Sequence, residues 1–241
     1  WKLDETVLSE DFLKISKKHK LDELTSRVLY QRGIHDESEI EKFLKPNLED
    51  LHDPFLLHDM EKATQRILSA IEQGENILIY GDYDADGMTA ASVMKSALDE
   101  LGAEAQVYLP NRFTDGYGPN LDVYQYYINN ENINLIITVD NGVAGVEAIA
   151  WAQENGVDVI ITDHHSMPDQ LPNAYAIIHP EHPESQYPFK YLAGVGVAFK
   201  VACALLEYAP REMLDLVAIG TIADMVSLTD HISNRPNGHQ I

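Results

Sequence analysis

The chain has 241 residues, a length that corresponds to one or two domains and allows a sizeable hydrophobic core. It contains 17 basic and 39 acidic residues, and the formal net charge of −22 excludes a protein that binds nucleic acid across a broad basic face. Any contact with nucleic acid is therefore expected to be local. Hydrophobic residues make up 45% of the chain and charged residues 23%, as in folded domains, and no apolar run is long enough for a membrane helix.

The single cysteine, Cys203, cannot form an internal disulfide, and no basic and apolar signal segment opens the chain. These two observations predict a cytoplasmic protein that does not contact a membrane. Since the first residue is Trp1 and not Met, we expect the natural N-terminus to lie outside this sequence.

Apolar residues at helical spacing predict a helical lead-in over residues 1–72, packed on the core. From Asn76 onward, short β-branched runs alternate with helical stretches. The expected strands are 77–80, 106–109, 135–139, 159–162 and 175–178. The expected helices between and after them are 90–101, 146–153, 195–208 and 211–226.

Near-continuous apolar strands separated by helices are typical of a parallel sheet covered on both faces, which binds ligands beyond the carboxyl ends of its strands. The expected fold class is therefore α/β, with a parallel β-sheet of about five strands flanked by helices. We expect this domain to occupy residues 73–230. Residues 231–241 do not continue the helical pattern and are expected to be an unassigned tail or a remnant of cloning.

Acidic residues and histidines directly follow three of the expected strands, at the edge where parallel strands end. A single Asp in such a place is typically a turn or a helix cap, but acids after three strands indicate a shared site. Carboxylates at alternate positions repel one another unless they are protonated or bind a cation, and imidazoles supply neutral nitrogen ligands. The residues are Asp82, Asp84 and Asp86 after the first strand, Asp140 after the third, and Asp163, His164 and His165 after the fourth.

This set of side chains predicts a metal site. Carboxylates with one or two imidazoles suit Mn²⁺ or Mg²⁺ better than a structural Zn²⁺, which usually brings cysteines. Two such ions that share a carboxylate would activate a water molecule and stabilise a phosphoryl oxygen.

Four motifs together resemble those of the DHH phosphoesterase superfamily. In chain order they are Gly81-Asp82-Tyr83-Asp84-Ala85-Asp86-Gly87, Val139-Asp140-Asn141-Gly142, Asp163-His164-His165 and Gly220-Thr221-Ile222-Ala223-Asp224. Within that superfamily, the flanking segments 112–118 and 187–200 resemble the RecJ family of exonucleases specific for single-stranded DNA. The resemblance extends over most of the chain.

The resemblance implies a DHH phosphoesterase fold, two bound Mn²⁺ or Mg²⁺ ions, and hydrolysis of single-stranded DNA from its 5′ end in repair and recombination. Asp140 is expected to bridge the two ions, and Asp82 is an additional candidate ligand. His165 is expected to face the scissile phosphate, while Asp163 orients a neighbouring imidazole. The metal ligands implied by the resemblance are Asp84, Asp86, Asp140, His164 and Asp224.

Candidate substrate contacts lie in the flanking segments. Arg112 is a candidate phosphate contact beside the site, although loop packing explains it equally well. Gly194 and Gly196 open an expected helix, where their amide groups either approach a phosphate or cap the helix. The His-Pro-Glu-His segment 179–182 is interpreted as a solvated loop rather than a second metal site.

The family's second domain, DHHA1, which supplies phosphate-binding basic residues, is expected to be missing from this chain, and a single-strand-binding protein is a candidate partner. Two alternatives stay open. One is a DHH phosphodiesterase acting on short RNA, cyclic dinucleotides or pyrophosphate, and the other is a non-catalytic scaffold of a replication complex. A scaffold would be expected to have lost metal ligands, whereas all the expected ligands are present here.

Overall fold

The computed structural model describes residues 6–228, and its contacts divide the chain into two compact units. The larger unit is His52–Val226, and the smaller unit includes the chain up to Leu51. Within the described residues, the smaller unit consists of helices joined by short turns. They are α1 (Glu10–Lys18), α2 (Glu23–Gln31), α3 (Glu37–Leu44) and the 3-10 turn η1 (Leu48–Asp50).

Helix caps and a small apolar core explain the smaller unit. The side chains of Ser9 and Asp22 accept hydrogen bonds from backbone N–H groups in the first turns of α1 and α2, which would otherwise lack partners. Phe12, Leu29 and Ile40 are buried together in the core of this unit. The predicted helical lead-in is therefore confirmed for this part of the chain.

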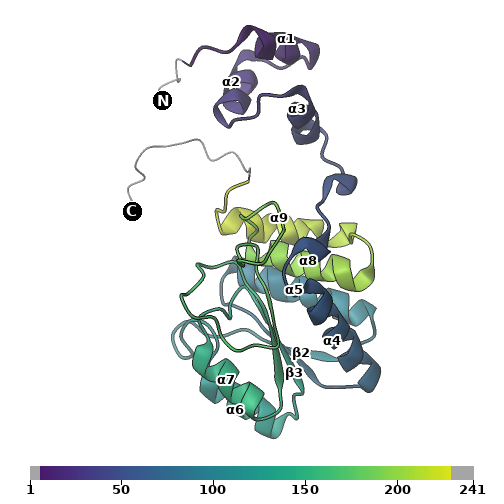
Figure 1. Cartoon of the computed structure of the whole chain (residues 1–241), viewed down its shortest axis with the longest axis vertical. Helices are drawn as coiled ribbons and strands as arrows, with labels where there is room; N and C mark the ends of the chain where they lie inside the picture. Colours follow the sequence, from purple (N-terminus) through teal and green to yellow (C-terminus); the bar gives the residue numbers. More distant parts are fainter. Residues whose placement is uncertain (1–5, 229–241) are drawn as a thin grey trace. The chain divides into compact units, whose positions relative to one another are not determined.

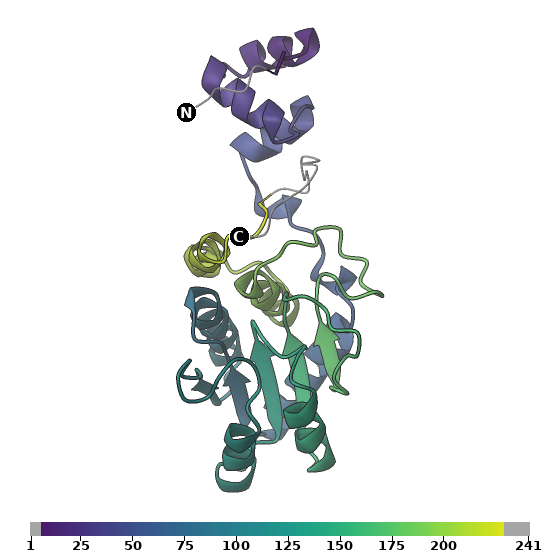
Figure 2. The same cartoon turned by 90° about the vertical axis from the view of Figure 1, so that its left-hand side faces the viewer.

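A parallel sheet organises the larger unit (Figures 1 and 2). The strands are β1 (Ile77–Tyr80), β2 (Ala105–Tyr108), β3 (Leu135–Val139), β4 (Asp158–Thr162) and β5 (Ala176–Ile178), in the order β2-β1-β3-β4-β5. Every pairing is parallel, and β1 and β3 are buried along their whole length. The predicted α/β fold with a five-stranded parallel sheet is therefore confirmed.

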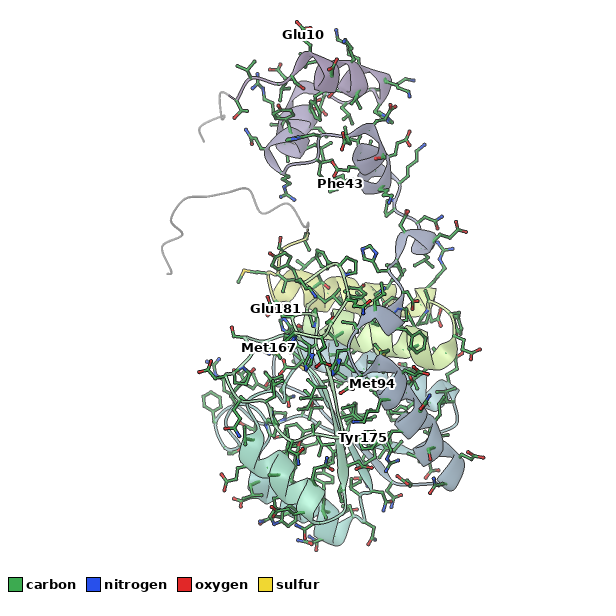
Figure 3. All side chains as sticks on the ribbon, in the orientation of Figure 1. Glu10, Phe43, Met94, Met167, Tyr175 and Glu181 are labelled. Atoms are coloured by element: carbon green, nitrogen blue, oxygen red, sulfur yellow. The ribbon has the colours of Figure 1, made fainter. Side chains whose placement is uncertain are left out.

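Helices cover both faces of this sheet (Figure 1). They are α4 (Met60–Gln73), α5 (Ala85–Glu100), α6 (Leu121–Asn130), α7 (Val146–Glu154), α8 (Gly194–Leu206) and α9 (Leu214–Ala223), with 3-10 turns η2 (Pro54–Leu56) and η3 (Arg211–Met213). Ile77 and Ile79 pack with α4, α5 and α8, whereas Leu78 and Tyr80 face α6 and α7, because strand residues alternate between faces. Met94 of α5, labelled in Figure 3, is buried in the first of these cores. Helix α9 packs against α5 and α8.

The strand order places a topological switch point between β1 and β3. The chain continues from β1 to β2 on one side and then returns to form β3 on the other side. Ligands of parallel sheets bind at such a point, beyond the carboxyl ends of the strands. Asn141 joins the two strand ends, because its Nδ2 donates to the carbonyl oxygens of Tyr80 (3.2 Å) and Val139 (2.9 Å).

Several boundaries differ from the sequence-based expectation. Helix α5 begins at Ala85, ahead of the expected start, because the Asp84 side chain accepts a hydrogen bond from the Gly87 N–H (3.0 Å) and caps the helix. Helix α6 was not expected. Helix α4 lies in the larger unit, and the expected functional division between residues 1–72 and 73–230 stays a prediction.

The expected tail at residues 231–241 lies outside the described residues. Among the helices that the structure describes, none is both long and apolar enough to cross a bilayer.

Candidate metal centre

The turn between β1 and α5 presents three carboxylates. Asp82 is buried and accepts a hydrogen bond from the Tyr83 N–H (2.7 Å), while Asp84 caps α5. Gly87 permits the turn, because a Cβ atom there would lie 2.7 Å from the Asp82 backbone. Burial raises the pKa of Asp82, and the nearby Asp84 charge adds to this effect. A bound cation would offset both costs.

Asp86 belongs to the first turn of α5, and its side chain contacts the amino end of α8. Its two carboxylate oxygens accept hydrogen bonds from the backbone N–H groups of Gly194 (2.7 Å) and Val195 (2.8 Å). The free N–H groups and the helix dipole at this end favour a negative charge. Burial nevertheless raises the pKa of Asp86, since the hydrogen bonds offset only part of the desolvation. The amino end of α8 therefore holds the Asp86 carboxylate in place. The raised pKa shows that the ionised carboxylate is still destabilised by burial, so a bound cation would stabilise it.

Asp140 follows β3 and is 1% exposed. Its backbone has a positive φ of 62°, in the left-handed region that Asp tolerates better than most residues. Its Oδ1 atom is buried and has no hydrogen-bond partner among the described residues. Burial, followed by the charge of Asp86, raises the pKa of Asp140 to about 10. A carboxylate in this state needs either a proton or a cation.

The imidazole of His164 lies among three carboxylates. Its Nε2 atom is 3.1 Å from Asp140 Oδ1, 3.6 Å from Asp86 Oδ2 and 3.7 Å from Asp224 Oδ2. This nitrogen is buried and, within residues 6–228, forms no hydrogen bond. Asp224 reaches this place from the carboxyl end of α9 and keeps a side chain that is 25% exposed. The four side chains come from four different segments of the chain and converge on one point.

Asp163 and His165 form a second, adjacent pair. Asp163 is buried, and its Oδ2 accepts the Val143 N–H (3.0 Å) while its Oδ1 accepts His165 Nδ1–H (2.8 Å). Burial acts to raise the pKa of Asp163, but the His165 contact and the backbone N–H donors outweigh burial and lower this pKa. The same hydrogen bond raises the pKa of His165. The His165 side chain is 37% exposed and so accessible to a ligand.

These donor atoms fit a divalent cation. Three groups of side chains place one ligand atom each within 4.8 Å of the others: Asp82 with Asp84 and Asp140, Asp86 with His164 and Asp224, and Asp140 with His164 and His165. The buried Oδ1 of Asp140 and Nε2 of His164 lack other partners within the described residues. Oxygen-rich sets with an imidazole suit Mn²⁺ and Mg²⁺. Every expected metal ligand is thus in one cluster, although its role in binding stays a prediction.

The three expected substrate contacts, Arg112, Gly194 and Gly196, lie in different surroundings. The Arg112 guanidinium lies over the ring of Tyr83, 5.4 Å from its centroid, beside the carboxylate turn. The Gly194 N–H donates to Asp86, so the structure gives this amide a different partner from the expected phosphate. Gly196 lies further into the buried helix α8. Phosphate contacts by these three residues stay predictions.

Sequence reasoning missed two supporting residues. Asn141 was part of a recognised motif but had no role assigned, although an amide directly after a candidate ligand is a usable signal. The interpretation of segment 179–182 as a solvated loop is wrong for His179, because this residue is completely buried. Its Nε2 donates to the carbonyl oxygen of His165 (2.8 Å). Nothing in the local sequence distinguishes it from His182.

The fold and the site define a parallel α/β protein with a cluster of carboxylates and imidazoles at its topological switch point that could hold a metal ion. The chain belongs to the DHH family: the model described as "DHH family, N-terminal domain" matches residues 76–221. The chain is also similar to the single-stranded-DNA-specific exonuclease RecJ of Bacillus subtilis, with 50% identity over 207 residues. That match covers 86% of this chain but 26% of the relative, so the chain spans about a quarter of the relative's length.

Solved structures of RecJ also match this chain. A crystal structure of exonuclease RecJ bound to manganese matches with a TM-score of 0.63 and 35% identity, over 70% of this chain and 44% of that chain. RecJ from Thermus thermophilus in complex with Mn²⁺ matches with a TM-score of 0.71 and 29% identity, over 89% of this chain and 30% of that chain. RecJ structures contain Mn²⁺ or Mg²⁺, which confirms the predicted choice of ions for this family; the number of ions here stays a prediction.

Proposed function

We propose that this chain is the catalytic part of a metal-dependent nuclease that hydrolyses single-stranded DNA from its 5′ end, in DNA repair and recombination. The observation that supports this most strongly is the convergence of carboxylates and imidazoles from separate segments around buried, unpartnered Asp140 and His164 atoms. The 50% identity to a single-stranded-DNA-specific exonuclease favours DNA as the substrate. The 5′ polarity rests on the family resemblance alone.

The side chains divide into two ligand sets. Asp82, Asp84 and Asp140 would hold one ion, and a second set, Asp86, His164 and Asp224, would hold another. Asp140 is the bridging ligand in this proposal, because its Oδ1 lies 3.1 Å from His164 Nε2 while its carboxylate also belongs to the first group. Bound ions of this kind supply an activated water molecule and stabilise negative charge on phosphoryl oxygens.

The chain's own residues position the phosphate. Asp163 accepts a hydrogen bond from His165 Nδ1–H and raises the pKa of this ring, and in the doubly protonated ring Nε2–H would donate to a phosphate oxygen. Arg112 adds a positive charge beside the carboxylate turn. Two other basic side chains of the larger unit are already paired: Arg66 pairs with Asp158 (2.6 Å), and Lys200 is buried with a hydrogen bond to the His52 carbonyl (2.8 Å).

Because 39 acidic residues outnumber 17 basic ones, we expect DNA affinity to come mainly from the metal centre and Arg112. The remainder of a longer protein is the proposed source of further contacts, in particular a DHHA1 domain, and a single-strand-binding protein is a proposed partner. The chain's length relative to its relatives is compatible with such additional parts.

The two alternative functions differ in whether they require intact metal ligands. A non-catalytic scaffold does not need intact ligands, yet here the ligands are present and converge. A phosphodiesterase for short RNA, cyclic dinucleotides or pyrophosphate would use the same ligands, so the site alone does not separate it from a DNA exonuclease. The similarity to RecJ beyond the motifs favours DNA.

A substrate comparison tests the proposal. The chain is incubated with Mn²⁺ and, separately, with 5′-phosphorylated single-stranded DNA, duplex DNA of the same sequence, a cyclic dinucleotide and pyrophosphate. We expect single-stranded DNA to be hydrolysed fastest, and we expect the Asp86→Asn variant to be inactive on it. Faster hydrolysis of the cyclic dinucleotide or pyrophosphate would replace this proposal with the phosphodiesterase, and no hydrolysis of any substrate would favour the scaffold.

A further inference from the structure

A buried histidine outside the metal cluster contacts the phosphate-facing segment. His179 directly follows β5 and is 0% exposed. Both of its ring nitrogens form hydrogen bonds: Nε2 with the carbonyl oxygen of His165 (2.8 Å) and Nδ1 with the backbone N–H of Glu181 (3.0 Å). It is absent from all the groups of candidate ligands within residues 6–228.

The two partners define the tautomer of His179. An N–H donor at Glu181 requires that Nδ1 accept, and a carbonyl acceptor at His165 requires that Nε2 donate. The ring is therefore neutral with its proton on Nε2. Burial also lowers the pKa of His179, which favours the same neutral form. The ring is a fixed donor aimed at one backbone oxygen.

This donor extends the contact between two strands beyond the end of the sheet. The β4–β5 pairing ends at Thr162 and Ile178, and one more backbone bond follows, from the Asp163 N–H to the Ile178 carbonyl (3.2 Å). Past that point, the chain that bears His164 and His165 leaves the sheet. The His179 side chain is the next link between the two segments, since it reaches the His165 carbonyl.

The segment that bears His179 is itself held in place. Lys190 donates from Nζ to the carbonyl oxygens of Pro180 (2.7 Å) and Ser185 (3.3 Å). Figure 3 labels Met167 and Glu181, which mark the loops after β4 and β5 at the same end of the sheet. Because the segment that carries the His179 ring is held, the ring can fix the position of the His165 carbonyl.

We propose that His179 is a positioning residue for His164 and His165, which acts by holding the His165 carbonyl with its Nε2–H. The proposal rests on the proposed function for its effect on catalysis, but not for its effect on metal binding. The held carbonyl belongs to the residue whose ring pairs with Asp163, and it follows His164 by one peptide unit. Loss of the hydrogen bond would let both imidazoles move and leave the His165 carbonyl without this donor.

Two variants separate the hydrogen bond from the packing. His179→Leu fills a similar volume but donates no hydrogen bond. His179→Gln carries an amide nitrogen at a reach comparable to that of Nε2 and restores a donor for the His165 carbonyl. The control is His182→Gln, in the same loop, because His182 stacks on His58 and contacts none of the candidate ligands.

The first measurement is Mn²⁺ affinity by calorimetric titration of the whole chain, with turnover of single-stranded DNA alongside. His179→Leu is expected to lose about 10- to 100-fold in Mn²⁺ affinity and in kcat, with a smaller change in KM, as is typical when a residue behind a ligand is removed. His179→Gln should recover most of this loss, and His182→Gln should match the wild type. Wild-type Mn²⁺ affinity and kcat in a folded His179→Leu chain, or a His179→Gln chain as impaired as His179→Leu, would overturn the proposal.

The second measurement does not depend on any variant folding. The ¹⁵N chemical shifts of the histidine rings in the metal-free wild-type chain report which nitrogen bears the proton, and we expect His179 protonated at Nε2 alone. A proton on Nδ1 would overturn the proposal. If the wild-type chain proves inactive on DNA, the proposed function fails, whereas the Mn²⁺ affinities and the ring tautomer still decide the role of His179.

Discussion

Asp140 is the residue on which we expect the candidate metal centre to depend most. It is buried, it has a positive φ, and its Oδ1 lacks a hydrogen-bond partner among the described residues. We predict that Asp140→Asn lowers turnover roughly a hundredfold or more, because it removes a charge from both ligand sets. The same change should raise the melting temperature of the metal-free protein, since a buried carboxylate becomes a neutral amide. Calorimetric titration with Mn²⁺ and thermal unfolding measure the two effects.

The matched control is Asp122→Asn, which changes an exposed carboxylate in the first turn of α6. It should leave Mn²⁺ binding unchanged and should not raise the melting temperature, because an exposed acid in the first turn interacts favourably with the helix dipole. If the Asp140→Asn chain still bound two Mn²⁺ ions tightly, Asp140 would not be the bridging ligand.

Individual site residues differed in how well the sequence predicted them. Asp82, Asp86 and Asp140 follow strands closely, and since parallel strands end at one edge, their proximity could be inferred from local sequence. Asp224 could be placed only through the family resemblance, because it follows an apolar helix far along the chain and its position depends on how α9 packs against α5. His179 was misplaced because burial of a loop residue depends on tertiary contacts that local sequence does not encode.

At the scale of elements, the amino end of α8 is expected to control the geometry of the centre. A Cβ atom on Gly194 would collide with the Asp140 carboxylate, whose position the ligand sets require. We predict that Gly194→Ala costs about 1–3 kcal/mol of stability, as overpacking typically does, and weakens Mn²⁺ binding. Thermal unfolding and Mn²⁺ titration check both effects.

Gly196→Ala is the control on the same helix. Its Cβ would lie 3.3 Å from Leu192 Cδ2, the end of a flexible side chain, and alanine is the better helix former. It should leave Mn²⁺ affinity unchanged. Equal losses of Mn²⁺ affinity in the two variants would contradict this prediction. They would show that any side chain added in this turn of α8 weakens Mn²⁺ binding, whether or not it contacts Asp140.

The strands were easier to predict than the helices. Short β-branched runs between turns placed β1 and β3 at their observed residues. Helix α6 was missed because its sequence, Leu-Asp-Val-Tyr-Gln-Tyr-Tyr-Ile-Asn-Asn, is rich in residues of low helix propensity. It forms because Asn120 caps it through the Val123 N–H (3.2 Å) and because Tyr124 is buried against the sheet. Tertiary packing outweighs propensity here.

For the whole molecule, the buried carboxylates predict how stability depends on pH. Burial raises the pKa values of Asp82, Asp86 and Asp140, so these groups bind more protons in the folded than in the unfolded metal-free chain. Their contribution to stability is therefore complete below the pKa of an unfolded Asp, near 4, and is lost progressively as the pH rises above it. Saturating Mn²⁺ should reverse this trend, because the cation binds the ionised carboxylates.

Melting temperatures between about pH 5 and pH 8, with EDTA and with Mn²⁺, measure this effect. The difference between the two conditions should grow as the pH rises. In the Asp140→Asn chain, the pH dependence of the metal-free form should be weaker. A metal-free wild-type chain that became more stable across this range would show that other groups dominate, such as His179 and His182, whose pKa values burial lowers and which therefore bind more protons in the unfolded chain.

The most direct test of the account is the polarity of hydrolysis on single-stranded DNA. One oligonucleotide is labelled at its 5′ end and an identical one at its 3′ end, and the products formed with Mn²⁺ are separated over time. If the centre hydrolyses DNA as proposed, labelled mononucleotide appears first from the 5′-labelled strand, while the 3′ label passes through progressively shorter fragments. First release of a labelled mononucleotide from the 3′ end, or cleavage in the interior of the strand, would contradict the account.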